Sequence, residues 1–81
     1  MNKIKNKIIT LDDDNDYAVF ESADYNNERY LYLININNLS DHQVCRLKIV
    51  NDDLCINIIN KDNEEYNNII NAFAKNIIIN L

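Results

Sequence analysis

Asp12, Asp14 and Asp16 have the spacing at which a calcium loop places its first three carboxylate ligands. The rest of that pattern is missing. The sixth position of such a loop would be Tyr17 instead of glycine, and the twelfth would be Ala23 instead of a bidentate glutamate. A chelate of this kind could neither turn sharply nor close around a cation. The segment therefore predicts a turn built from Asp and Asn, and no metal site.

Cys45, Cys55 and His42 are the residues from which a zinc site or a thiol nucleophile would be built. Zinc takes four ligands, and His42 has the opposite strand parity from Cys45. A nucleophile needs a base within hydrogen-bond reach and a third group that orients the base. The two cysteines are also expected to lie offset along a hairpin. We therefore predict free thiols, no enzyme and no cofactor.

Eighty-one residues are enough for one domain, so residues 1–81 are predicted to form a single α+β domain. The chain has no Gly and no Pro and is rich in Asn and Ile, a usage typical of an AT-rich genome. A low-GC Gram-positive bacterium, or a phage or plasmid within one, is the expected source. Without Gly, every turn that requires a positive φ must use Asn or Asp.

The net charge of −5 disfavours nucleic acid as a direct partner and also disfavours an anionic membrane surface. A basic protein surface suits this charge best. Neither a secretory signal nor an apolar stretch of about 18 residues is present, so we expect a cytoplasmic protein with reduced cysteines.

Alternating apolar residues and the turn residues between them predict five strands, at residues 3–11, 17–22, 29–36, 44–50 and 54–58. The third strand is apolar on both parities and is expected in the middle of the sheet. Asp62 and Glu65 form a capping box, and Glu64 beside them favours a helix start. Behind them comes one helical face: Tyr66, Ile69, Ile70, Phe73 and Ile77.

The predicted fold is an antiparallel β-meander of about five strands with one C-terminal amphipathic helix on one face or across one end. Residues 77–81 either extend the helix or add a short strand. Lys3, Lys5 and Lys7 would share a face of the first strand, where lysines protect a sheet edge or contact phosphates or an acidic partner. The side chains of Tyr25, Tyr30 and Tyr32 form either an aromatic binding platform or ordinary sheet packing.

Three motifs carry a resemblance to a known family: residues 9–13 (ITLDD), residues 25–33 (YNNERYLYL) and the acidic helix start at residues 62–65 (DNEE). On these motifs the segment 8–75 resembles the YrzB-like family of small acidic proteins of unknown function from low-GC Gram-positive bacteria. Asn27 stands where the family's turn has Gly. The resemblance implies a hairpin at Asn26 and Asn27, and it implies no activity.

These observations favour a non-catalytic acidic module that binds a basic surface of another protein. A concrete version is a phage or mobile-element inhibitor of the anti-CRISPR type, which occupies the nucleic-acid groove of a host defence nuclease. The alternative is a housekeeping structural or regulatory protein that self-associates as a homodimer. The candidate partner-binding residues are all in turns: Asp12, Asp13, Asp14, Asp16, Asp52 and Asp53.

Overall fold

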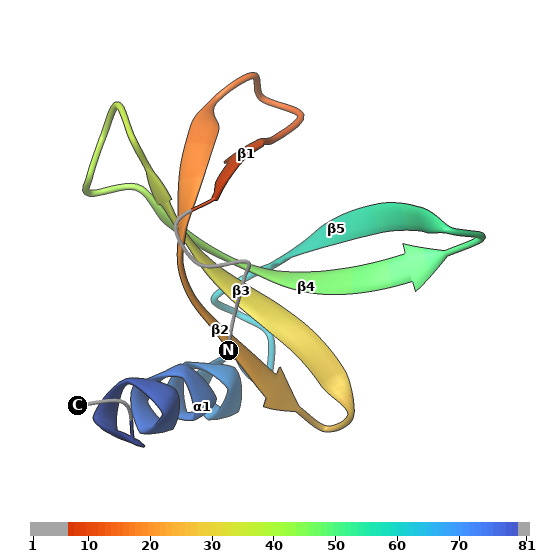
Figure 1. Cartoon of the computed structure of the whole chain (residues 1–81). Helices are drawn as coiled ribbons and strands as arrows, with labels where there is room; N and C mark the ends of the chain where they lie inside the picture. Colours follow the sequence, from red (N-terminus) through yellow and green to blue (C-terminus); the bar gives the residue numbers. More distant parts are fainter. Residues whose placement is uncertain (1–6, 80–81) are drawn as a thin grey trace.

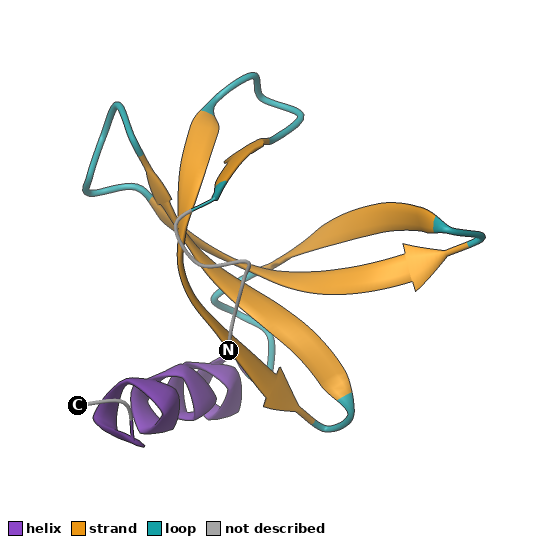
Figure 2. Cartoon of the chain, in the orientation of Figure 1, coloured by secondary structure: helices purple, strands orange, loops and turns teal. Residues whose placement is uncertain are grey.

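A computed structural model describes residues 7–79 of the chain as one twisted antiparallel sheet and one helix (Figures 1 and 2). The five strands lie in the sheet in their sequence order. The elements are β1 (Ile8–Thr10), β2 (Asp16–Tyr25), β3 (Glu28–Asn35), β4 (His42–Val50), β5 (Asp53–Ile59) and α1 (Tyr66–Ile79). The predicted α+β meander with a C-terminal helix is confirmed, and β3 is its central strand.

The turns use Asn and Asp in the left-handed region, as a chain without Gly requires. Asn26 and Asn27 have φ angles of 55° and 65°, and they join β2 to β3. Asn51 and Asp52, at 51° and 67°, join β4 to β5 in the same way. Two consecutive positive φ angles define the two-residue turn whose twist matches that of an antiparallel hairpin. Asp14, at 63°, turns the longer loop between β1 and β2.

Strand β2 is longer than the predicted segment 17–22. It contains a bulge and stays paired with β3 as far as Tyr25. The register shifts between Val19 and Glu21, so Phe20 is the extra residue. In the described part of the chain the first strand is Ile8–Thr10, so Lys7 and Leu11 of the predicted segment 3–11 lie outside it. The prediction for Lys3 and Lys5 lies outside the described residues.

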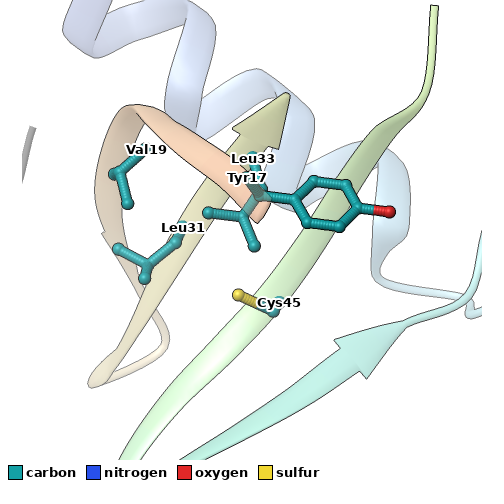
Figure 3. Close-up of a cluster of buried hydrophobic side chains, with 5 residues drawn as sticks. All are labelled: Tyr17, Val19, Leu31, Leu33 and Cys45. Carbon is teal, nitrogen blue, oxygen red and sulfur yellow. The ribbon is translucent and has the colours of Figure 1, made fainter. Parts of the chain in front are cut away.

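Both faces of the sheet carry a buried cluster. Figure 3 shows the first cluster, on the face away from α1: Tyr17, Val19, Leu31, Leu33 and Cys45. The second lies between the sheet and α1: Ala23, Tyr30, Val44, Ile69 and Phe73. The central position of β3 explains why its apolar residues alternate between the two clusters. Strand β4 does likewise, since Val44 is buried beneath the helix and Cys45 on the other face.

Helix α1 begins at Tyr66, so the predicted capping box at Asp62 and Glu65 is wrong as a helix start. Residues 61–65 form turns instead, in which the Glu65 amide donates to Asn63 Oδ1 at 2.8 Å and the Tyr66 amide donates to the Asn63 carbonyl at 3.0 Å. Asn side chains favour such local bonds, which compete with an earlier start of the helix. Of residues 77–81, those up to Ile79 belong to the helix, and the last two lie outside the described residues.

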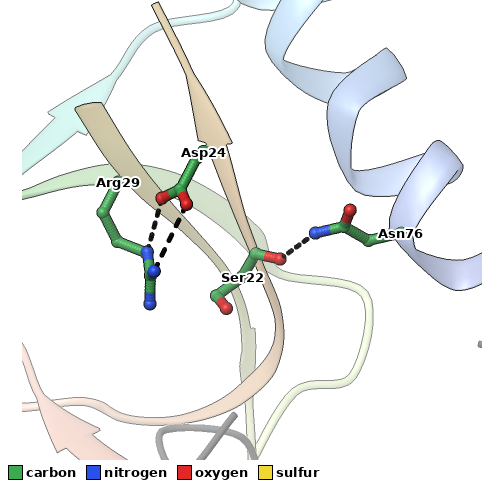
Figure 4. Close-up of polar contacts among 4 residues, drawn as sticks. All are labelled: Ser22, Asp24, Arg29 and Asn76. Carbon is green, nitrogen blue, oxygen red and sulfur yellow. Dashed lines mark hydrogen bonds and ion pairs between the residues drawn. The ribbon is translucent and has the colours of Figure 1, made fainter. Parts of the chain in front are cut away.

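The helix is fixed to the sheet by a polar contact as well as by its apolar face. Asn76 Nδ2 donates a hydrogen bond of 2.7 Å to the backbone carbonyl of Ser22 (Figure 4). Ser22 belongs to the part of β2 that extends beyond its pairing with β1. The helix therefore contacts a part of β2 that has no β1 partner among the described residues. Within residues 7–79, no helix is long and apolar enough to cross a membrane.

Candidate interaction surface

A groove of about 450 Å³ lies between the β1–β2 hairpin and the β4–β5 hairpin, which diverge in Figure 1. We call it the hairpin groove. Its first wall consists of Leu11, Asp12 and Asp13, with Thr10 at the end of β1. Its second wall is the row of side chains on one face of β5, formed by Leu54, Ile56 and Ile58, and its floor includes Tyr17 and Gln43. One wall is therefore acidic and the other apolar.

The acidic wall is held in place by contacts inside the β1–β2 loop. Asp13 Oδ1 accepts a hydrogen bond of 3.0 Å from the Asn15 amide, and this bond is the main reason why the pKa of Asp13 is lowered. Asp16 Oδ1 accepts a hydrogen bond of 2.6 Å from Thr10 Oγ1 across the strand pair. The turn interpretation is thus confirmed for Asp12, Asp13 and Asp14, whereas it is wrong for Asp16, which is the first residue of β2. Asp12 and Asp14 are exposed, and Asp12 faces the groove with Asp13.

Asp52 and Asp53 lie at the tip of the other hairpin. Asp52 occupies the turn and Asp53 begins β5, and both are exposed. Neither lines the hairpin groove. The six predicted aspartates therefore belong to two separate hairpin ends, and the structure brings only Asp12 and Asp13 to the groove.

Asp41, at the end of the β3–β4 loop, was missed by the sequence reasoning. Its Oδ2 accepts a hydrogen bond of 2.6 Å from the Tyr17 hydroxyl and one of 3.2 Å from Asn35 Nδ2, and its Oδ1 accepts one of 2.9 Å from Gln43 Nε2. These donors lower the pKa of Asp41, the Tyr17 hydroxyl most of all. A tyrosine at a buried strand position was the available signal, because its hydroxyl needs a partner.

The Tyr17 side chain connects the groove floor to the core. The residue is 1% exposed, and its pKa is raised to about 12 by the hydrogen bond to Asp41 and by burial. The negative charge of Asp13 raises this pKa further. The Tyr17 hydroxyl is therefore neutral at physiological pH and donates its hydrogen bond to Asp41.

The apolar wall is more exposed than the alternation of β5 suggests. Leu54 is 58% exposed and Ile58 is 43% exposed, whereas Ile56 packs partly against the first cluster. Ile49, which pairs with Leu54 on β4, is 71% exposed. The helix covers the opposite face of the sheet, so no layer in the described part shields this row. The hairpin presents an apolar surface next to the acidic loop.

The tyrosines considered as a binding platform belong to the packing beneath α1. Tyr30 is buried, and its ring lies 6.3 Å from that of Tyr25. The Tyr32 ring stands at 90° to Phe73 with a centroid distance of 5.5 Å, while the Tyr32 hydroxyl and His42 Nδ1 are 2.8 Å apart. The interpretation as ordinary sheet packing is confirmed.

The thiols are free, and strand register keeps them apart. Cys45 pairs with Ile58, and Cys55 pairs with Lys48. Burial raises the pKa of the Cys45 thiol to about 12, so Cys45 carries no thiolate at neutral pH. Among residues 7–79, no group of three or more His, Cys, Asp and Glu side chains could hold a metal ion.

Comparison with family models, with curated proteins and with solved structures gave no match for this chain. The resemblance to the YrzB-like family therefore stays a prediction.

Proposed function

We propose that this protein is a non-catalytic interaction module that binds a basic, partly apolar segment of another protein in the hairpin groove. The observation that supports this proposal most is the pairing of an acidic wall, Asp12 and Asp13, with the apolar wall of β5. A segment with Lys or Arg on one side and apolar residues on the other satisfies both walls. The net charge of −5 adds long-range attraction for such a partner. We place this function in the cytoplasm, where the two cysteines stay reduced.

A narrower form of the proposal makes the partner a nucleic-acid-binding enzyme, such as a host defence nuclease. The aspartates would then occupy phosphate positions, as in a phage or mobile-element inhibitor of the anti-CRISPR type. In this form, duplex DNA competes with the module for its partner, and binding falls steeply with salt. In the broader form the partner segment is not a nucleic-acid-binding site, so DNA does not compete. The apolar wall then carries much of the binding.

The test uses a defined probe, a seven-residue peptide of alternating Lys and Leu, added to ¹⁵N-labelled protein. We expect amide shifts to change at Leu11, Asp12 and Asp13 and along β5. A peptide of alternating Glu and Leu is the matched control and is expected to leave the spectrum unchanged. Equal binding of both peptides, or shift changes confined to other surfaces, would contradict the proposal.

Charge reversal distinguishes binding in the hairpin groove from attraction by the net charge of the protein. The double substitution D12K/D13K changes the net charge by the same amount as E64K/E65K, and all four side chains are exposed. Glu64 and Glu65 lie in the turns before α1 and do not line the groove. We expect D12K/D13K to weaken binding of the basic peptide about tenfold or more, and E64K/E65K to have a small effect. Equal losses would mean that only the net charge attracts the peptide.

A further inference from the structure

Strand β5 is a sheet edge of an unusual composition. It pairs only with β4, so its other side is an edge of the described sheet. Residues 54–60 contain no charged residue and no Pro, the usual devices that keep an edge from pairing with another chain. At the opposite edge of the described sheet, β1 has three residues, and Asn76 of α1 donates a hydrogen bond to Ser22 in the neighbouring part of β2. Strand β5 therefore lacks the features that usually prevent an edge strand from pairing with another chain.

The register identifies which backbone groups point out of that edge. In a hairpin with a two-residue turn, the residues that flank the turn form a hydrogen-bonded pair, here Val50 and Asp53. Hydrogen-bonded and non-hydrogen-bonded pairs then alternate along an antiparallel ladder. Leu54, Ile56 and Ile58 occupy the non-hydrogen-bonded pairs with β4, so their N–H and C=O groups point to the open edge.

This edge is complementary to itself. When two β5 strands pair antiparallel with Ile56 opposite Ile56, every outward-pointing residue of one copy faces an outward-pointing residue of the other. Leu54 then lies opposite Ile58 of the second copy, and the exposed parts of both side chains are buried against each other.

We propose that β5 pairs with β5 of a second copy in this register, so that the two sheets become one continuous sheet across a two-fold axis at Ile56. Three hydrogen-bonded residue pairs give about six hydrogen bonds. This inference goes beyond the proposed function. Both interactions use the side chains of β5, but the dimer also needs the backbone groups at the edge of the sheet, whereas the hairpin groove also needs Asp12 and Asp13.

The first test is sedimentation equilibrium of the full chain from about 1 to 500 μM. An interface of one strand edge falls in the small class, below about 1,200 Å², and we expect a dimer with a micromolar dissociation constant. Leu54→Lys places a charge in the edge and should weaken the dimer about tenfold or more. The matched control Leu39→Lys makes the same change in the β3–β4 loop, where Leu39 is 72% exposed, and should leave the dimer intact.

A chain that remains monomeric over this range overturns the proposal, and so does a dimer that both lysine variants weaken equally. The monomer result would leave the proposed function standing, because both walls of the hairpin groove belong to a single copy of the chain. Conversely, loss of peptide binding in D12K/D13K with an unchanged dimer separates the two surfaces.

The second test reads the register in a folded chain and does not depend on the lysine variants. In the proposed pairing, Asn57 lies opposite Cys55 of the second copy, in a non-hydrogen-bonded pair with Cα atoms about 4.5 Å apart. This distance suits a disulfide. With oxidised glutathione as the oxidant, Asn57→Cys should give a covalent dimer, and N57C/C55A should not. A covalent dimer that forms equally in both variants, or in neither, overturns the register.

Discussion

The strongest test of the packing is to remove the Phe73 ring. Phe73 is 2% exposed, lies between α1 and the sheet, and stands edge-on to Tyr32. A buried Phe→Ala substitution lowers the free energy of unfolding by about 3–5 kcal/mol. A domain of 81 residues has a total of about 4–12 kcal/mol. Phe73→Ala is therefore expected to remove at least a quarter of the free energy of unfolding. If the loss exceeds the total, the variant does not fold.

The assay is urea unfolding followed by far-UV circular dichroism at 25 °C. The matched control is Asn71→Ala on the exposed side of the same helix, for which we expect a change within about 0.5 kcal/mol. If Phe73→Ala does not fold, Phe73→Leu keeps part of the buried volume and should give a smaller, measurable loss. A loss below about 1 kcal/mol for Phe73→Ala would refute the packing of α1 on the sheet.

Three further predictions concern a turn, the thiols and the alkaline limit of stability. Asn27→Ala places a residue with a Cβ and no local hydrogen bond at φ 65°, and should lower the free energy of unfolding in urea by about 1 kcal/mol. Cys55 is partly exposed and Cys45 is buried, so one thiol should react rapidly with Ellman's reagent in the native protein, and Cys55→Ala should abolish that fast phase. The folded-state pKa of Tyr17, about 12, lies above its ordinary value of 10.0, so Tyr17 stabilises the fold fully below pH 10 and this contribution is lost as the pH rises through 12. Wild type should accordingly lose more stability between pH 10 and 12 than Tyr17→Phe, as measured by urea unfolding at each pH, and equal losses would mean that Asp41 does not hold the Tyr17 hydroxyl.

Much of the fold is predictable because its signals are local. The absence of Gly forces Asn and Asp into the positive-φ positions, and these residues therefore mark the turns at Asn26, Asn27, Asn51 and Asp52. The alternation between the turns gives the strands, and short connections make consecutive strands neighbours. The helix start was misplaced because the Asp62 to Glu65 spacing matches a capping box, while local bonds to Asn63 set a later start.

The candidate site was less predictable, because it depends on contacts between distant segments. The aspartates were found as acidic turns, but sequence spacing could not show that Asp12 and Asp13 share a groove with β5. Asp41 was missed because its strongest donor, the Tyr17 hydroxyl, lies 24 residues away in the chain. The exposure of Leu54 and Ile58 was hidden as well, since alternation reports which residues share a face and not whether another layer covers that face.

The sequence by itself therefore determined the order of the strands, the turns, the apolar face of α1 and the charge of the molecule. Each follows from local conformational preference and from the periods of a strand and a helix. Only the tertiary structure decided which face of the sheet the helix covers. One helix can cover only part of one face, so within residues 7–79 the other face keeps exposed apolar side chains and β5 remains an edge of the sheet. That uncovered surface is where both proposed interactions lie.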